Sequence, residues 1–270
     1  MDAVQDACQI KGADDLYGIG VRAGLYTQWV ATLIATLFDP ETESDIRLAN
    51  IIIQCSIFLG LCTESRNDGA SAVGAIVTQV LLCGSLSSLT GDGFNHAGKV
   101  SGIMRFLFYT GLSAYGCWFW FYGIDSMMRP GCNEVAFFGL TSFHGWFRTL
   151  GKVLSIIGVV LCSILDIYSL YALGVRFSQG MEAFAPPPKQ RPQVELSLLV
   201  ISTGLLVFSI VLIEYILDHN RIELDNSPIS VGQLIPLIAG GLAALLVLWK
   251  VIMNGLMWKG RCWFLFGKHL

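Results

Sequence analysis

The sequence predicts an all-α, polytopic membrane helix bundle with seven transmembrane helices. Of its 270 residues, 54% are hydrophobic and only 14% are charged, whereas a soluble domain has about a quarter of its residues charged. The mean hydropathy is +0.61. A surface that faces lipid needs no charged cover, so the bilayer is expected to be the solvent for most of the chain.

Seven segments are apolar enough to be interpreted as spans, because a helix needs about 20 such residues to cross the hydrocarbon core with its backbone bonded internally. The second is short and the third is rich in Gly and Ser, which favours packing against protein rather than lipid. A tail (1–18) precedes this transmembrane domain (19–253), and a cytosolic tail (254–270) follows it. The predicted spans are 19–38, 46–62, 69–90, 103–122, 150–174, 196–217 and 230–253.

Seven crossings place the two termini on opposite sides of the membrane. Of the 17 Lys and Arg residues, fewer fall on the N-terminal side than on the other, which predicts an outside or lumenal N-terminus and a cytosolic C-terminus. The endoplasmic reticulum or another endomembrane is the favoured location, with the plasma membrane as the alternative. Cys8 and Cys132 lie in aqueous segments on the outer side, where they are either a disulfide or two free thiols.

Composition and motifs exclude several classes of function. A net charge of -3 gives no basic footprint for nucleic acid, and no C-x-x-C or histidine spacing indicates a metal site. The glycines of 18–24 resemble a dinucleotide loop, but the third is one position late. Those of 93–99 resemble a phosphate loop, but Val100 replaces the Ser or Thr that would bind magnesium. We therefore expect no cofactor and no metal.

Ionisable residues within the spans are the first candidates for function, because a charge at membrane depth is costly and needs a partner. Asp166 falls well inside the fifth predicted span and Glu214 near the outer end of the sixth. At a rise of ~1.5 Å per residue, they differ in depth by roughly 20 Å, so they do not form a catalytic carboxylate pair. Arg105 or Arg47 is the expected partner of Asp166.

Glu214 is expected in an outer pocket, because Asp218 lies one turn further along the same helix face. Arg22 and Asp125 fall at a similar depth, and aromatic residues end the fourth span. The alternative interpretation is a set of packing ion pairs beneath an interfacial aromatic belt. The expected aromatic wall consists of Trp118, Trp120 and Tyr122.

Three glutamines from the first three spans fall near the middle of the membrane. They are expected either to hydrogen-bond to one another between helices or to line a polar cavity. They are Gln28, Gln54 and Gln79.

Short motifs over residues 1–175 resemble a group of fungal multi-pass membrane proteins. They are the segments 15–29, 117–125 and 145–149, which read DLYGIGVRAGLYTQW, CWFWFYGID and GWFRT. Some members of that group resemble the membrane-bound terpene cyclases of meroterpenoid biosynthesis. The resemblance implies an enzyme of fungal secondary metabolism that cyclises a hydrophobic, prenylated substrate taken from the lipid bilayer.

Such a cyclase needs a protonated carboxyl in a dry cavity and aromatic faces to stabilise cations. Under this hypothesis Glu214 is the proton donor, Asp125 and Asp218 tune it, and Asp166 is the second choice. No cofactor is required. The expected substrate-binding residues are Arg22, Trp118, Trp120, Tyr122, Gln28 and Gln79.

A transporter, channel or receptor-like protein without catalysis is the alternative hypothesis, since seven spans with an outer N-terminus and intramembrane acids are also typical of these classes. The lack of an evident internal repeat argues against a transporter. A structural membrane subunit is a third possibility. The oligomeric state is left open.

Overall fold

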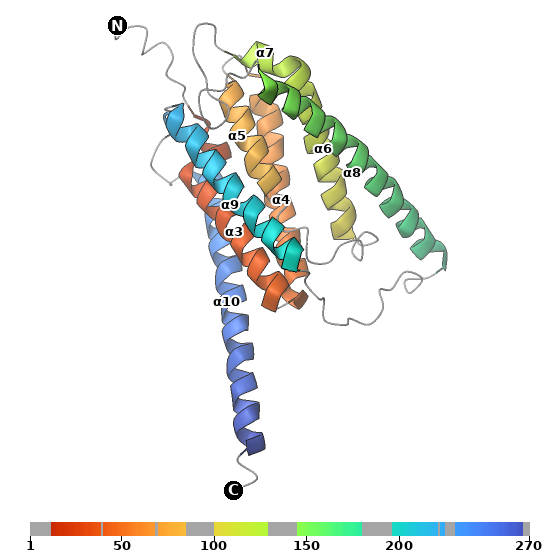
Figure 1. Ribbon diagram of the computed structural model, residues 1–270, viewed down its shortest axis with the longest axis vertical. Helices are drawn as coiled ribbons and strands as arrows, with labels where there is room; N and C mark the ends of the chain where they lie inside the picture. The colour runs from red at the N-terminus through yellow and green to blue at the C-terminus, as the bar shows by residue number, and fades with distance from the viewer. Residues whose placement is uncertain are drawn as a thin grey trace.

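The chain forms a bundle of α-helices, described here in a computed structural model (Figure 1). The structure describes residues 12–38, 40–67, 70–84, 100–128, 145–179, 196–220, 222–224 and 230–266, so Cys8 and Cys132 lie outside it. The all-α prediction is confirmed for this part of the chain. Its helices are α2 (Asp14–Tyr17), α3 (Ile19–Phe38), α4 (Pro40–Glu64), α5 (Ala72–Cys83), α6 (Val100–Trp118), the π-helix η3 (Phe119–Gly123), α7 (Ile124–Met127), α8 (Trp146–Gln179), α9 (Leu196–His219) and α10 (Val231–Phe266).

Four of these helices are long and apolar enough to cross a bilayer, which supports a membrane-embedded protein. They contain the segments Ile46–Glu64, Trp146–Val175, Val200–His219 and Val231–Met253. Of the other predicted spans, α3 and α6 have the expected extent but carry Arg22 and Arg105. The described part of α5 has only 12 residues, or about 18 Å of helix against about 30 Å of hydrocarbon. The number of seven spans therefore stays a prediction, as does the orientation.

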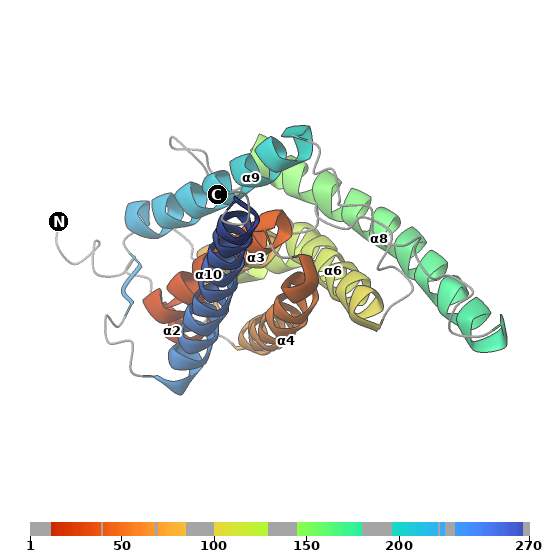
Figure 2. The ribbon, with the colours of Figure 1, turned by 90° about the horizontal axis from the view of Figure 1, so that it is seen from below.

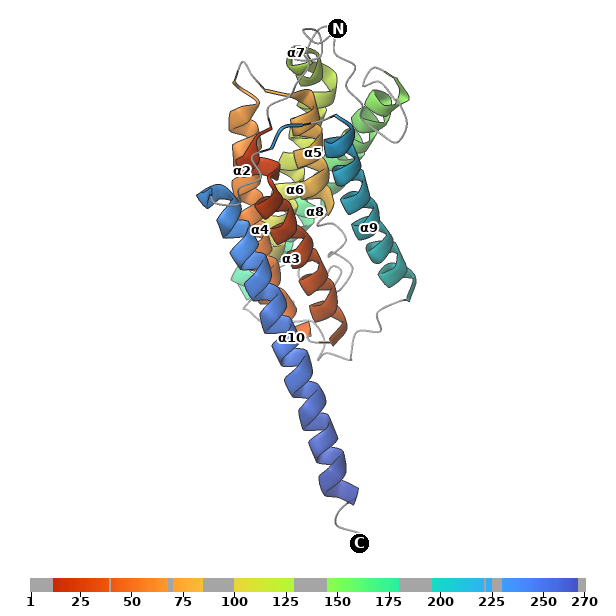
Figure 3. The same cartoon turned by 90° about the vertical axis from the view of Figure 1, so that its left-hand side faces the viewer.

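The closest helix pair is α3 with α10, which run side by side in all three overall views (Figure 3). A Cβ atom at Gly24 would collide with the carbonyl of Pro236, and one at Gly240 would collide with the carbonyl of Gly24. The amide of Gly20 donates to Oε1 of Gln233 across the interface at 3.1 Å. Small residues let the two backbones approach this closely.

Helix α10 extends past the other helices at the end of the bundle opposite α7 (Figures 1 and 3). The helix continues to Phe266, through most of the predicted cytosolic tail (254–270).

The second extensive pair is α6 with α8. Seen along the bundle, α8 lies on the far side of α6 from α3 and α10 (Figure 2). Within Trp146–Val175, only 11% of an apolar stretch of 18 residues is buried. Its outward face is therefore the part of the described surface best suited to lipid.

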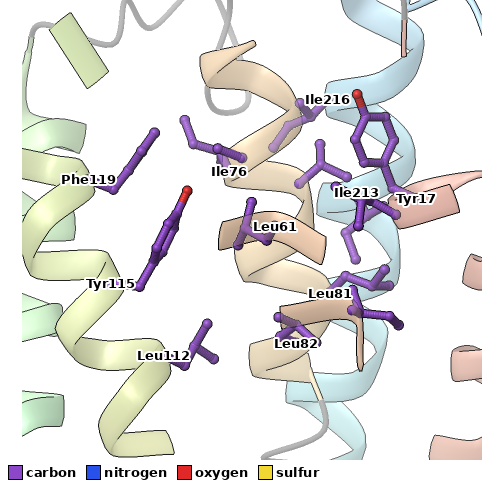
Figure 4. Close-up of a cluster of buried hydrophobic side chains, with 14 of the residues drawn as sticks. Tyr17, Leu61, Ile76, Leu81, Leu82, Leu112, Tyr115, Phe119, Ile213 and Ile216 are labelled. Atoms are coloured by element: carbon purple, nitrogen blue, oxygen red, sulfur yellow. The ribbon is translucent and has the colours of Figure 1, made fainter. Parts of the chain in front are cut away.

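The hydrophobic core is centred on α5, between α4, α6 and α9. Nine of its 12 residues are buried, because a helix of small and branched residues fits between larger neighbours on every side. Rings from α6 and aliphatic side chains from α9 converge on it (Figure 4). The labelled core residues are Tyr17, Leu61, Ile76, Leu81, Leu82, Leu112, Tyr115, Phe119, Ile213 and Ile216.

The α3–α10 contact predicts different outcomes for two neighbouring glycines. Gly240→Ala should lower the free energy of unfolding by about 1–3 kcal/mol, because the new methyl group meets a backbone carbonyl that cannot rotate away. Gly241→Ala should be neutral or mildly stabilising, since nothing lies within 4 Å of a Cβ atom there. Thermal unfolding of both variants in detergent measures the difference. Equal melting temperatures would contradict the close approach of α3 and α10.

Candidate functional site

Arg22 on α3 and Glu214 on α9 form an ion pair that joins the two helices. The hydroxyl of Tyr26 donates to the other oxygen of Glu214 at 2.9 Å, and Nε of Arg22 donates to the carbonyl of Tyr17 at 3.0 Å. Both oxygens of Glu214 are therefore occupied by protein groups. The proximity of Arg22 to Glu214 that the sequence predicted is present, but the arrangement links helices rather than presenting an acid to a substrate.

Asp125 on α7 is held by Arg148, which lies in the first turn of α8. The guanidinium donates to both carboxylate oxygens at 2.8 and 2.7 Å, and to the carbonyls of Trp120 and Phe121 at 3.0 and 3.1 Å. Both carbonyls belong to η3, where the wider helical turn changes the regular backbone bonding. Arg148 thus fastens α8 to the π-helix and to Asp125 at once.

The first turns of α3 and α8 and the last turns of α9 lie at the same end of the bundle as α7 (Figure 1). Both pairs therefore lie at this end, called the α7 end below. Each carboxylate has its own arginine, and the described contacts do not connect the two pairs. Asp218 is exposed near the end of α9. Glu214 and Asp125 therefore each belong to an ion pair of their own.

The three expected wall aromatics point in different directions. Trp120 is buried and packs edge-on against Phe147, with centroids 5.6 Å apart. A Cβ atom at Gly151 would strike its indole ring. Trp118 is 43% exposed and Tyr122 is 75% exposed, so neither shares a buried wall with Trp120.

The predicted glutamine cluster is not formed by hydrogen bonds in the described structure. Gln28 and Gln54 are buried, but Gln79 donates to the carbonyl of Ala75 on its own helix at 3.3 Å. The side-chain oxygen of Gln28 is buried without a hydrogen-bond partner.

Asp166 is buried on α8, and its partner differs from the one expected. The hydroxyl of Thr110 on α6 donates to Oδ2 at 2.6 Å, while Oδ1 is buried without a partner. Neither Arg105 nor Arg47 pairs with Asp166 among the described contacts.

A cavity of about 400 Å³ at the α7 end is the site that sequence reasoning missed. It lies between α2, the end of α4, the start of α5 and α7. Gly and Ala residues line much of it, which leaves room for a ligand. Its polar side chains are Tyr17, Glu64, Ser65 and Ser71, and its larger apolar side chains are Leu16, Leu61 and Met127. We call this cavity the end pocket.

Several polar atoms of the end pocket have unused hydrogen-bonding capacity. The hydroxyl oxygen of Tyr17 accepts the amide of Ala13 at 2.9 Å, and the described contacts give its phenol proton no acceptor. The Ser71 hydroxyl precedes α5 without capping it and is buried without a partner. The Glu64 carboxylate accepts one hydrogen bond, from the side-chain amide of Asn67 at 3.0 Å.

Tyr17 is a neutral donor in this setting. Burial raises the pKa of its phenol, and the nearby carboxylates Glu64 and Asp14 raise it further, while the backbone of Ala13 acts in the opposite direction. The pocket can therefore offer a phenol proton from Tyr17, a buried hydroxyl from Ser71 and a carboxyl from Glu64.

The predicted spans did not reveal this pocket, because its polar residues lie at the ends of the spans or in the connections between them. Ser65 additionally shares a short hydrogen bond of 2.6 Å with Tyr115 of α6. The useful signal in the sequence is the clustering of Glu64, Ser65 and Ser71 around one connection. Comparison of the chain with known protein families, curated proteins and solved structures found no match.

The role of Arg148 predicts that lysine cannot replace it. Arg148→Lys should lower the free energy of unfolding by about 1–2 kcal/mol, because an ammonium cannot hold two carboxylate oxygens and two carbonyls in one plane. Arg66→Lys, at an exposed position of the same end, is the matched control and should be neutral. Thermal unfolding in detergent measures both. An unchanged Arg148→Lys protein would show that the guanidinium contacts contribute little.

Proposed function

We propose that this chain is a multi-pass membrane protein that binds a small, amphipathic, hydroxyl-bearing molecule in the end pocket. Four apolar helices support the membrane location. The observation that carries the binding proposal is the pairing of a cavity of about 400 Å³ with a buried, unpartnered Ser71 hydroxyl in its lining. A buried polar atom without a partner is uncommon in a folded protein and suggests a place for a ligand group.

The polar groups that line the end pocket favour a ligand with a hydroxyl group. A hydroxyl group accepts the phenol proton of Tyr17 and donates its own proton to Glu64, so it satisfies both residues at once. The apolar body of the same molecule would contact Leu16, Leu61 and Met127. The cavity volume lies in the range of about 300–1,000 Å³ that small-molecule sites occupy.

Fewer Lys and Arg residues fall on the side of the α7 end than on the opposite side. This asymmetry supports placing the α7 end on the outer or lumenal side. In an endomembrane such as the endoplasmic reticulum, the end pocket would then open toward the lumen. A ligand would reach it from the outer leaflet interface.

Binding is tested by thermal shift of the purified protein with a panel of prenylated phenols, prenyl alcohols and the corresponding hydrocarbons. Glu64→Gln should weaken binding of the hydroxylated compounds about tenfold, because a hydrogen bond to a charged group becomes a neutral one. Ala70→Phe should abolish binding by filling the cavity.

The matched control is Thr63→Val, whose exposed side chain bonds only to its own helix at Leu59. It should bind like the wild type. Equal shifts for hydrocarbons and their alcohols, or binding that survives Ala70→Phe, would refute the site.

Acid-initiated cyclisation of a prenylated substrate is a second candidate function, suggested by the sequence resemblance. One observation favours a revised form of it: among the described residues, the lining of the end pocket contains the carboxyl of Glu64 and no Arg or Lys. Glu64 would then be the proton donor in place of Glu214, whose two oxygens are occupied by Arg22 and Tyr26. Tyr17 would lie beside the bound substrate.

Expression in a host supplied with prenylated phenols and their epoxides, followed by product analysis, tests this activity. Glu64→Gln should reduce product formation at least about 100-fold, as expected for loss of a general acid. Glu214→Gln should retain turnover, apart from any loss of folded protein. Full activity in Glu64→Gln would remove that residue from the role, and no product from any substrate would leave binding alone as the function.

A further inference from the structure

We propose that Asp166 and Ser169 form an intramembrane site for a monovalent cation, either a proton or Na⁺, between α6 and α8. This proposal is independent of the end pocket. Asp166 lies within the apolar segment Trp146–Val175, far along α8 from the α7 end. Its neighbours in sequence, Leu165 and Ile167, are apolar, and Ile167 is largely exposed on the outward face.

The carboxyl group of Asp166 is buried. Only 8% of Asp166 is exposed, and its single described partner is the hydroxyl of Thr110, at 2.6 Å from Oδ2. Oδ1 is buried and has no hydrogen-bond partner. An ionised carboxylate in hydrocarbon is costly unless a positive charge accompanies it.

A second unpartnered oxygen lies one turn further along α8. Ser169 is fully buried, and its hydroxyl has no hydrogen-bond partner. Residues three apart share one face of a helix, so the free oxygens of Asp166 and Ser169 lie on the same side of α8. Carboxylate and hydroxyl oxygens are the ligand types that hard cations prefer.

The described residues give Asp166 no positive partner. The titratable and charged groups described near it include Cys162 on α8, one turn before Asp166, and Tyr109 and Arg105 on α6. Cys83 of α5 lies beside Cys162. Arg105 lies beside the phenol of Tyr109, and the described part of the chain gives Asp166 no ion pair. A cation from solution would supply the missing positive charge.

Further polar side chains lie along the same helix pair, toward the α7 end. A Cβ atom at Gly158 would lie 2.5 Å from the Ser113 hydroxyl, and one at Gly116 would lie 2.6 Å from the Ser155 hydroxyl. Ser113 and Ser155 thus face the opposite backbone between Asp166 and the α7 end. Small residues and hydroxyl groups, rather than large apolar side chains, fill this part of the α6–α8 contact.

The test uses the full chain in liposomes and the apolar reagent dicyclohexylcarbodiimide. A protonated carboxyl adds across the carbodiimide bond to give an O-acylisourea, which rearranges to a stable N-acylurea that mass spectrometry can locate. In sodium-free medium, we expect Asp166 to be modified. Glu214 and Asp125, each held by an arginine, serve as internal controls and should be modified at least about fivefold less.

Addition of NaCl, with choline chloride as the matched salt, distinguishes the two cations. Labelling that Na⁺ suppresses about fivefold or more identifies a sodium site that competes with the proton. In that case the Ser169→Ala variant should require a several-fold higher Na⁺ concentration than the wild type for the same protection of Asp166 against labelling. If NaCl does not change the extent of Asp166 labelling, the site binds a proton rather than Na⁺.

Infrared spectroscopy supplies a measurement that does not depend on reagent access. In sodium-free medium the wild type should have a protonated-carboxyl carbonyl band that Asp166→Asn lacks, while Glu214→Gln keeps it. Absence of both labelling and this band in sodium-free medium would overturn the proposal.

Discussion

The structure depends on one constraint, which is that a charge at or near membrane depth is costly unless a partner accompanies it. Arg22 meets this constraint by bonding to Glu214 and to the carbonyl of Tyr17, which ties α9 to the start of α3. Arg148 meets it by bonding to Asp125 and to two carbonyls of η3, which ties α8 to the end of α6. The two arginines therefore connect helices that share few other polar contacts.

Close packing of small residues holds together helices that the two ion pairs do not join. Gly24 and Gly240 bring α3 and α10 into backbone contact, and Gly20 bonds to Gln233 across the same interface. At the α7 end, the N-terminal turns of α5 lie beside α2 and the end of α4. Small residues at this junction, including Gly74 and Ala75, leave the end pocket unfilled.

The sequence predicted the helical class and several helix bounds because hydrophobic runs report directly on burial in lipid. It also placed Arg22 near Glu214, since residues at equal depth on neighbouring helices have few other options. It did not identify Thr110 as the partner of Asp166, because depth alone does not determine which helices are adjacent. It missed the end pocket for a similar reason: Tyr17, Glu64 and Ser71 come from separate elements, and only their tertiary arrangement creates a cavity.

The π-helix has a consequence for how this protein tolerates insertions and deletions. Such a turn accommodates one residue more than an α-helix would over the same length. Removing one residue from Phe119–Gly123 would therefore restore a regular α-helical turn and leave the orientation of the following segment nearly unchanged. The carboxylate of Asp125 would still face the guanidinium of Arg148, but the carbonyls of Trp120 and Phe121 would return to regular helix bonding and be lost to Arg148 as acceptors. The extra residue of this segment thus determines how many acceptors Arg148 has.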